Sequence, residues 1–229
     1  NPLRLAGIPL AFVSLAEDKQ TWSETNWRVN LDWTPNEDTL VYGYVTTGYR
    51  SGGYGLGILD ARAGGPGGTP VGILSYDKET VTAYELGYKG TLLEDTVQLF
   101  AAIYTYQYDD YQDQVDVYDA VQGTSRDIPV NTGETSNSGF EVEGTWLATD
   151  NLTVNANYSY TKTEYKDDVQ LLEDENHLAP EPLFGSTSFN INGNSLKGIP
   201  DHKFTAWASY EWILPSESTV TLNGAYSYR

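Results

Sequence analysis

Acidic side chains concentrate in one short segment of this sequence, where five aspartates lie close together: Asp109, Asp110, Asp113, Asp116 and Asp119. A calcium site needs several oxygen ligands that converge on one ion. In an extended chain, side chains alternate between two sides, so Asp110 and Asp116 would point away from Asp113 and Asp119. No EF-hand spacing is present, and the run Glu173-Asp174-Glu175 offers none either. The sequence therefore favours solvated acidic loops, and we expect neither a bound metal nor a cofactor.

The two histidines, His177 and His202, are far apart in the sequence and have no motif around them. A Ser-His-Asp triad assembles in space rather than along the chain. The chain, however, contains no Gly-x-Ser-x-Gly elbow. It also contains no Cys, which removes thiol catalysis, disulfides and cysteine metal sites. We therefore expect a protein that is not an enzyme.

The segment GYRSGGYGLG (48–57) carries a cation and two aromatic rings among glycines. A glycine-rich loop binds phosphate where it leads into a helix N-terminus, and no helix is predicted to follow here. The segment follows a predicted strand and opens a long connection. We expect Tyr49, Arg50 and Tyr54 to contact a small-molecule ligand at the mouth of the molecule.

The elements that must position these residues are β-strands. Apolar and polar residues alternate along much of the chain, which is the pattern of strands with one apolar and one polar face. In NLTVNANYSYT (151–161), every second residue is apolar or aromatic, and the intervening residues are small and polar. The pattern predicts eight strands, near residues 22–34, 39–51, 79–91, 96–110, 134–147, 152–165, 199–213 and 219–229. Two of them, 39–51 and 96–110, carry apolar residues on both faces, so we expect something apolar to cover part of their inner faces.

The connections between these strands alternate between short and long. Short turns are predicted at 35–38, 93–95, 149–151 and 215–218, and long loops at 52–78, 111–133 and 166–198. Bacterial outer-membrane barrels have short turns at one end and long loops at the other. Trp33, Trp146 and Trp212 each precede a short turn on the apolar face, and we assign Tyr42 to the same interfacial girdle. A second girdle is predicted toward the loop end, formed by Tyr160, Tyr226 and Tyr228.

Composition agrees with a membrane barrel and excludes other classes. The 229-residue chain has a formal net charge of −19, so nucleic acid, which requires clustered Lys and Arg, is not an expected partner. Mean hydropathy is −0.45 and no apolar run is long enough for a transmembrane helix. Barrel strands expose only alternate residues to lipid and need no such run. The predicted strands, about 12 residues long, exceed the usual globular length of about 5–6 residues. We therefore predict an all-β, antiparallel transmembrane β-barrel.

Four segments also resemble one family: GYRSGG (48–53), YELGYKGTLLED (84–95), SGFEVEGTWLATDNLTV (138–154) and IPDHKFTAWASYEW (199–212). In this order and spacing they are similar to the C-terminal barrel region of TonB-dependent outer-membrane receptors, over about residues 21–229. The resemblance implies a 22-stranded barrel with an internal plug, coupled to an inner-membrane TonB complex. It implies uptake of a scarce nutrient such as a ferric siderophore, across an outer membrane of lipid and lipopolysaccharide.

On this reading, residues 1–229 form one partial barrel of about eight consecutive strands, and the plug and the final strands lie outside the chain. Two alternatives remain at this stage. A passive porin-like channel has the same strand pattern but no plug. A soluble β-sandwich adhesin or binding module would bury its apolar face against a second sheet. The sequence does not identify the substrate.

Overall fold

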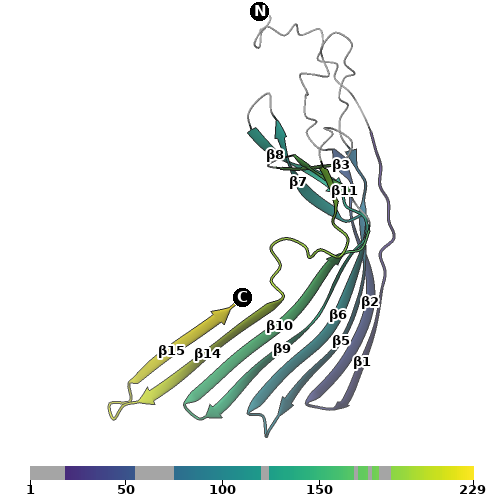
Figure 1. The fold of residues 1–229 in the computed structure, drawn as a ribbon. Helices are drawn as coiled ribbons and strands as arrows, with labels where there is room; N and C mark the ends of the chain where they lie inside the picture. Colours follow the sequence, from purple (N-terminus) through teal and green to yellow (C-terminus); the bar gives the residue numbers. More distant parts are fainter. Residues whose placement is uncertain (1–18, 55–74, 120–123, 168–169, 175–176, 181–186) are drawn as a thin grey trace, which may run out of the picture.

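The computed structural model describes residues 19–54, 75–119, 124–167, 170–174, 177–180 and 187–229, and its main element is one large antiparallel sheet (Figure 1). Its eight strands follow one another in chain order as a meander: β1 (Arg28–Asn36), β2 (Thr39–Arg50), β5 (Glu79–Leu92), β6 (Val97–Asp109), β9 (Thr135–Thr149), β10 (Leu152–Tyr165), β14 (His202–Ile213) and β15 (Thr219–Tyr228). The all-β antiparallel prediction is confirmed. The first strand starts later than predicted, at Arg28 instead of residue 22, and β14 starts at His202 instead of residue 199.

Cross-strand pairing sorts the side chains of this sheet onto two faces, because paired residues in a ladder share a face. One row runs Leu31, Gly43, Leu86, Ile103, Phe140 and Tyr160 across six strands. The neighbouring positions form another row, which runs Tyr44, Glu85, Tyr104, Gly139 and Thr161. The sheet therefore has one apolar face and one face on which carboxylates, hydroxyls and tyrosine rings alternate.

The apolar face is open to the surroundings rather than covered by a second layer of protein. Leu31 is 74% exposed, Leu222 is 62% exposed and Tyr226 is 61% exposed. A β-sandwich would bury such side chains at its centre. Among the described residues, the buried apolar cluster consists only of Tyr165, Ile191 and Leu196, at one end of the sheet. The apolar face is therefore built to contact an apolar medium.

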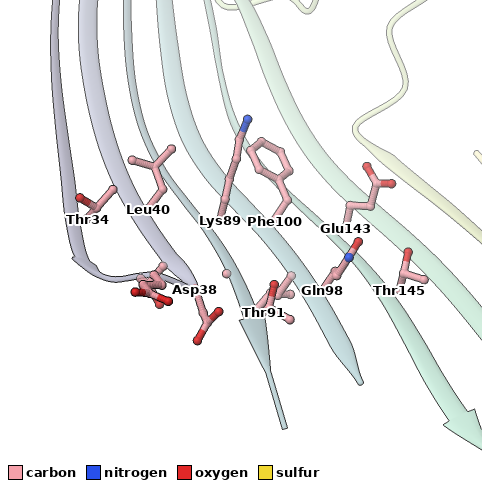
Figure 2. A pocket seen from close by; sticks show the side chains of 13 residues that line it. Thr34, Asp38, Leu40, Lys89, Thr91, Gln98, Phe100, Glu143 and Thr145 are labelled. Carbon is pink, nitrogen blue, oxygen red and sulfur yellow. The ribbon is translucent and has the colours of Figure 1, made fainter. Parts of the chain in front are cut away.

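The polar face is the concave one. One cavity on this face takes its lining from five successive strands (Figure 2). Figure 1 shows the strands sweeping round as part of a barrel wall, with short turns at one end. The part of the chain that the structure describes contains no helix able to cross a membrane.

All three predicted long loops contain further strands. Residues 111–133 include the hairpin β7 (Gln112–Asp119) and β8 (Thr124–Asn131). Residues 166–198 include a small sheet of β11 (Gln170–Asp174), β12 (His177–Pro180) and β13 (Thr187–Asn190). At the first loop, β3 (Gly53–Tyr54) pairs with β4 (Ser75–Tyr76). The alternation of short and long connections is confirmed, but these connections are not plain loops.

The predicted position on the apolar face near the short turns is confirmed for the three tryptophans and wrong for Tyr42. Trp33, Trp146 and Trp212 lie on the convex apolar face near the short turns and are 62%, 50% and 44% exposed. Trp33, however, pairs with Val41, so Tyr42 faces the concave side. The cause is an irregularity in the β1–β2 ladder between Trp33 and Asn36, which shifts the register by one residue.

Candidate ligand path along the concave face

The three residues expected at the mouth do not all face the same side of the sheet. Tyr49 and Arg50 are adjacent in β2 and therefore point to opposite faces. Register places Tyr49 on the convex face, and Arg50 lies on the concave side opposite Glu79. Tyr54, in β3, packs edge-on against Trp22 at a ring-centroid distance of 6.5 Å. Of the three, Arg50 and Tyr54 remain candidates for ligand contact.

The acidic residues of the two segments are distributed over several elements. Within the residues that the structure describes, no group of three His, Cys, Asp or Glu side chains is close enough to hold an ion. Asp116 and Asp127 pair across the β7–β8 hairpin, and Asp119 pairs with Thr124. Glu173 and Asp174 belong to β11, and Glu175 lies outside the described residues. Asp113 accepts a hydrogen bond from the Tyr165 hydroxyl at 2.5 Å.

The two histidines lie in different strands of different sheets. His177 begins β12 and His202 begins β14. His202 lies on the convex face, where its Nδ1 is 2.8 Å from the hydroxyl of Tyr158 and its ring lies 5.1 Å from that of Tyr160. It belongs to an aromatic group near the loop end of the sheet.

The concave wall has at its centre a carboxylate held by two phenols. The hydroxyls of Tyr42 and Tyr44 donate to the two oxygens of Glu85, each at 2.7 Å. The two tyrosine rings are stacked with an interplanar angle of 8°. Arg28 lies over the Tyr44 ring at 3.9 Å from its centroid. Such charge-assisted bonds fix side chains that would otherwise be free to rotate in an open lumen.

Glycines on the neighbouring strands allow the tyrosine rings to lie along the wall. A Cβ at Gly139 would be 2.7 Å from the Tyr104 hydroxyl, which reaches across to Thr161 Oγ1 at 3.0 Å. Tyr104 stacks on Tyr106 at a centroid distance of 5.0 Å. Aromatic residues often cover glycines of an adjacent strand in this way. The inner surface is therefore a fixed aromatic wall with carboxylates between the rings.

Toward the short turns this wall opens into a cavity of about 620 Å³ (Figure 2). Lys89 and Glu143 supply opposite charges on its wall, and Leu40 and Phe100 supply apolar surface. Lys89 Nζ lies 5.5 Å from the Phe100 ring centroid and 5.6 Å from that of Tyr42. The remaining polar lining consists mostly of small side chains: Thr34, Thr39, Thr91, Gln98 and Thr145. Such a lining suits water and polar solutes.

At the other end, the side-chain amides of Gln112 and Asn131 hold the bases of the long connections together. The side chain of Gln112, only 8% exposed, donates to the carbonyl oxygens of Ser51 and Asp77 at 3.0 and 2.9 Å. Asn131 accepts from the Asp77 amide at 2.7 Å and donates to the carbonyl of Asp110 at 2.7 Å. These bonds join the first two long connections at the mouth, and the Tyr165–Asp113 hydrogen bond ties the end of β10 to them; together these residues form a collar.

The pKa values of several ionisable groups in and beside the collar are shifted by burial and by neighbouring charges. Burial, and then the hydrogen bond to Asp113, raises the pKa of Tyr165 well above its usual value. Burial also raises the pKa of Tyr111, with Asp113 and Glu79 nearby. Lys78 forms an ion pair with Glu24, which raises the pKa of Lys78 and lowers that of Glu24. The mouth therefore keeps its phenols neutral.

Sequence reasoning did not identify most of this wall. Alternation along 84–89 places Glu85 and Lys89 on the polar face, but it does not indicate that Tyr42 and Tyr44 bond Glu85. The one indication in the sequence was that 39–51 and 96–110 carry apolar or aromatic residues on both faces of the strand. The strand pairing shows that the aromatic residues on the concave face are Tyr42, Tyr44, Phe100, Tyr104, Tyr106 and Tyr108.

Comparisons with known proteins agree with this two-faced sheet. The family model described as TonB dependent receptor-like, beta-barrel, matches residues 9–229. No curated protein matches the chain significantly. The ferric yersiniabactin uptake receptor FyuA from Yersinia pestis is similar in structure, with 18% identity and a TM-score of 0.56 over 87% of this chain and 25% of that chain. The copper transporter OprC has 16% identity and a TM-score of 0.54 over 80% and 23%. The chain spans about a quarter of either protein, and the likeness concerns the fold.

Proposed function

The chain belongs to the TonB-dependent receptor-like β-barrel family, and from this premise we propose that it forms about eight strands of a 22-stranded active transporter. Barrels of this family lie in the bacterial outer membrane, and so does this chain. The proposed activity is uptake of a scarce nutrient, such as a ferric siderophore. The partners are a TonB energy-transducing complex, acting through an internal plug, and a bilayer of lipid and lipopolysaccharide.

The contrast between the two faces of the sheet carries this proposal. The convex face exposes Leu31, Leu86 and Leu222, which suits hydrocarbon. The concave face carries charged and hydroxyl groups that need water or protein partners. Glu141 and Glu143 face this side and are exposed, and no ion pair joins either of them to another described residue. A domain inside the barrel that presents cationic groups would satisfy them.

The proposed route starts at the collar, where Arg50 and Tyr54 meet the ligand. It then follows the concave wall past the tyrosines and ends in the cavity beside Lys89 and Glu143. No catalytic step is involved, because members of this family are transporters. Rearrangement of the plug would open the route.

The test uses the full-length receptor in a bacterium that lacks its own copy. Accumulation of radioactive iron is measured with ferric siderophores supplied one at a time, in cells with and without the TonB complex. Active transport predicts accumulation only where the complex is present. Equal accumulation in both strains, together with steady conductance of the purified protein in planar bilayers, would support the passive channel. A receptor that stays monodisperse in buffer without detergent would support the soluble module.

A further inference from the structure

We propose that the tyrosines of the concave wall form a relay that carries one-electron oxidation to phenols whose hydroxyls are bonded to carboxylates. These phenols are Tyr165, bonded to Asp113, and Tyr42 and Tyr44, bonded to Glu85. The reactant is an oxidising radical such as the hydroxyl radical, which forms where peroxide meets reduced iron or copper ions. This activity goes beyond the proposed transport function and does not depend on it.

In the middle of the wall, the phenol rings are close to one another. The rings of Tyr42 and Tyr44 are stacked with their centroids 6.5 Å apart. Tyr44 and Tyr104 pair with Glu85 from opposite sides, so two strand spacings, about 10 Å, separate their backbones. Tyr104 in turn stacks on Tyr106 with a centroid distance of 5.0 Å. An electron can tunnel between aromatic rings over such distances.

The series continues from the middle of the wall to the mouth. Tyr106 and Tyr108 are successive residues on the concave face of β6, about 7 Å apart along the strand. The ring of Tyr108 meets that of Tyr111 edge-on, with a centroid distance of 5.5 Å. Tyr111 packs against the buried cluster that contains Tyr165. The phenols therefore connect the collar with the pair of tyrosines beside Glu85.

A carboxylate accepts the phenol proton at each end of this series. Glu85 accepts hydrogen bonds from Tyr42 and Tyr44, each at 2.7 Å, and Asp113 accepts one from Tyr165. A phenol that loses an electron becomes a strong acid and must release its proton. A charge-assisted hydrogen bond already directs that proton toward a base. The carboxylate-bonded phenols are therefore the ones that the wall makes easiest to oxidise.

The reaction at the mouth balances without a further reactant. A hydroxyl radical takes a hydrogen atom from the half-buried phenol of Tyr111 and becomes water, which leaves a phenoxyl radical. Tyr165 then gives an electron to that radical and its own proton to Asp113. Tyr111 takes up a proton from water and is a phenol again. The unpaired electron ends on a ring that is only 6% exposed, away from the ligand path and from lipid.

The burial of Tyr165 makes the relay testable. The full-length receptor in detergent is treated with peroxynitrite in bicarbonate buffer, which yields the carbonate radical and nitrogen dioxide. The carbonate radical oxidises accessible phenols, and nitrogen dioxide adds to the phenoxyl radicals that result. Mass spectrometry of peptides then locates the nitrated tyrosines. Direct attack would spare Tyr165, whereas the relay predicts that Tyr165 is nitrated.

Two variants separate the relay from direct attack. Tyr111→Phe keeps the ring but removes the phenol that passes oxidation on, and Asp113→Asn removes the proton acceptor. We expect either change to lower nitration of Tyr165 severalfold. The matched controls are Tyr160→Phe, on the convex face of the same strand as Tyr165, and Asp109→Asn, at the end of β6. Both controls should leave nitration of Tyr165 unchanged.

A misfolded variant cannot imitate the expected result, because exposure of Tyr165 would raise its nitration. Absence of nitration at Tyr165 in the parent would overturn the proposal. Undiminished nitration in either Tyr111→Phe or Asp113→Asn would overturn it as well. Since the readout is a modification of the purified receptor, failure here leaves the transport proposal to its own test.

Discussion

The ring of Tyr42 lies directly across Gly87 of the neighbouring strand, so that a Cβ at Gly87 would be 2.3 Å from the ring. This close approach lets the Tyr42 hydroxyl reach Glu85, two residues away in β5. Gly87 is therefore required by a side chain of another strand, because any side chain at this position would collide with the Tyr42 ring. The same relationship yields the first prediction.

Gly87→Ala should displace the Tyr42 ring and break its hydrogen bond to Glu85. A hydrogen bond to a charged group contributes about 1.5–3 kcal/mol, and we expect a loss of about 2 kcal/mol in the free energy of unfolding. Urea unfolding of the full-length receptor in lipid vesicles measures this change in the free energy of unfolding. The control is Gly144→Ala on the convex face, where a Cβ meets nothing closer than 3.8 Å. An equal loss in both variants would contradict the argument.

Two neighbouring residues of β15 test which face meets lipid. Leu222→Lys places a charge on the convex face, where Leu222 is 62% exposed, and should cost about 2–4 kcal/mol near the bilayer centre. Asn223→Lys places the same charge on the concave face, paired with Ser209, and should cost much less. Unfolding midpoints in vesicles distinguish the two. Equal costs would mean that lipid does not contact the convex face.

The turn between β5 and β6 contains three consecutive residues with left-handed backbone: Leu93, Glu94 and Asp95, with φ values of 54°, 54° and 67°. Left-handed geometry costs a residue with a Cβ about 1–2 kcal/mol. Glu94→Gly should therefore stabilise the folded state by about 0.5–1 kcal/mol after the entropy of the glycine is subtracted. The unfolding midpoint of the variant measures this gain.

The β1–β2 turn supplies the control for that prediction. Asp38 is not among the residues with positive φ, and its amide donates to Asn36 Oδ1 at 3.0 Å. Asp38→Gly removes no strain and should destabilise the protein by about 0.5–1 kcal/mol. If both glycines changed stability in the same direction, backbone strain would not be the cause.

Alkaline pH should weaken the collar through Tyr165. Burial and the hydrogen bond to Asp113 raise the folded-state pKa of Tyr165 above the unfolded value of about 10. The folded state then keeps a proton that the unfolded state releases. This stabilisation is therefore complete below pH of about 10 and is lost as the pH rises further. Tyrosinate absorbance of the parent minus that of Tyr165→Phe isolates this titration.

Asp113→Asn should move the Tyr165 titration to lower pH, because the negative charge beside the phenol is removed. The titration should stay above the usual tyrosine range, since burial is the larger cause. Asp109→Asn, which neutralises a carboxylate at the end of β6, should leave it in place. A shift of the same size in Asp109→Asn would show that overall charge, and not the hydrogen bond, sets the pKa.

The strands and their two faces could be read from the sequence, because alternation is a property of the extended chain itself. Leu152, Val154 and Tyr158 share a face wherever the strand is placed. The same holds for Phe204 and Tyr210 in β14. The tryptophans before the short turns were located correctly for this reason. These features need only local geometry and a period of two.

Tertiary structure decided the features that depend on register and on contacts distant in the chain. The register shift between Trp33 and Asn36 moved Tyr42 to the concave face, where it meets Glu85 from another strand. The sequence does not show this register shift, because 39–51 carries apolar residues on both faces and either face could be taken as the outer one. The collar bonds of Gln112 and the packing of Ile191 and Leu196 against Tyr165 likewise join residues far apart in sequence. Their partners are fixed only when the strands align, since hydrogen-bond geometry across a ladder is set by the pairing and not by either strand alone.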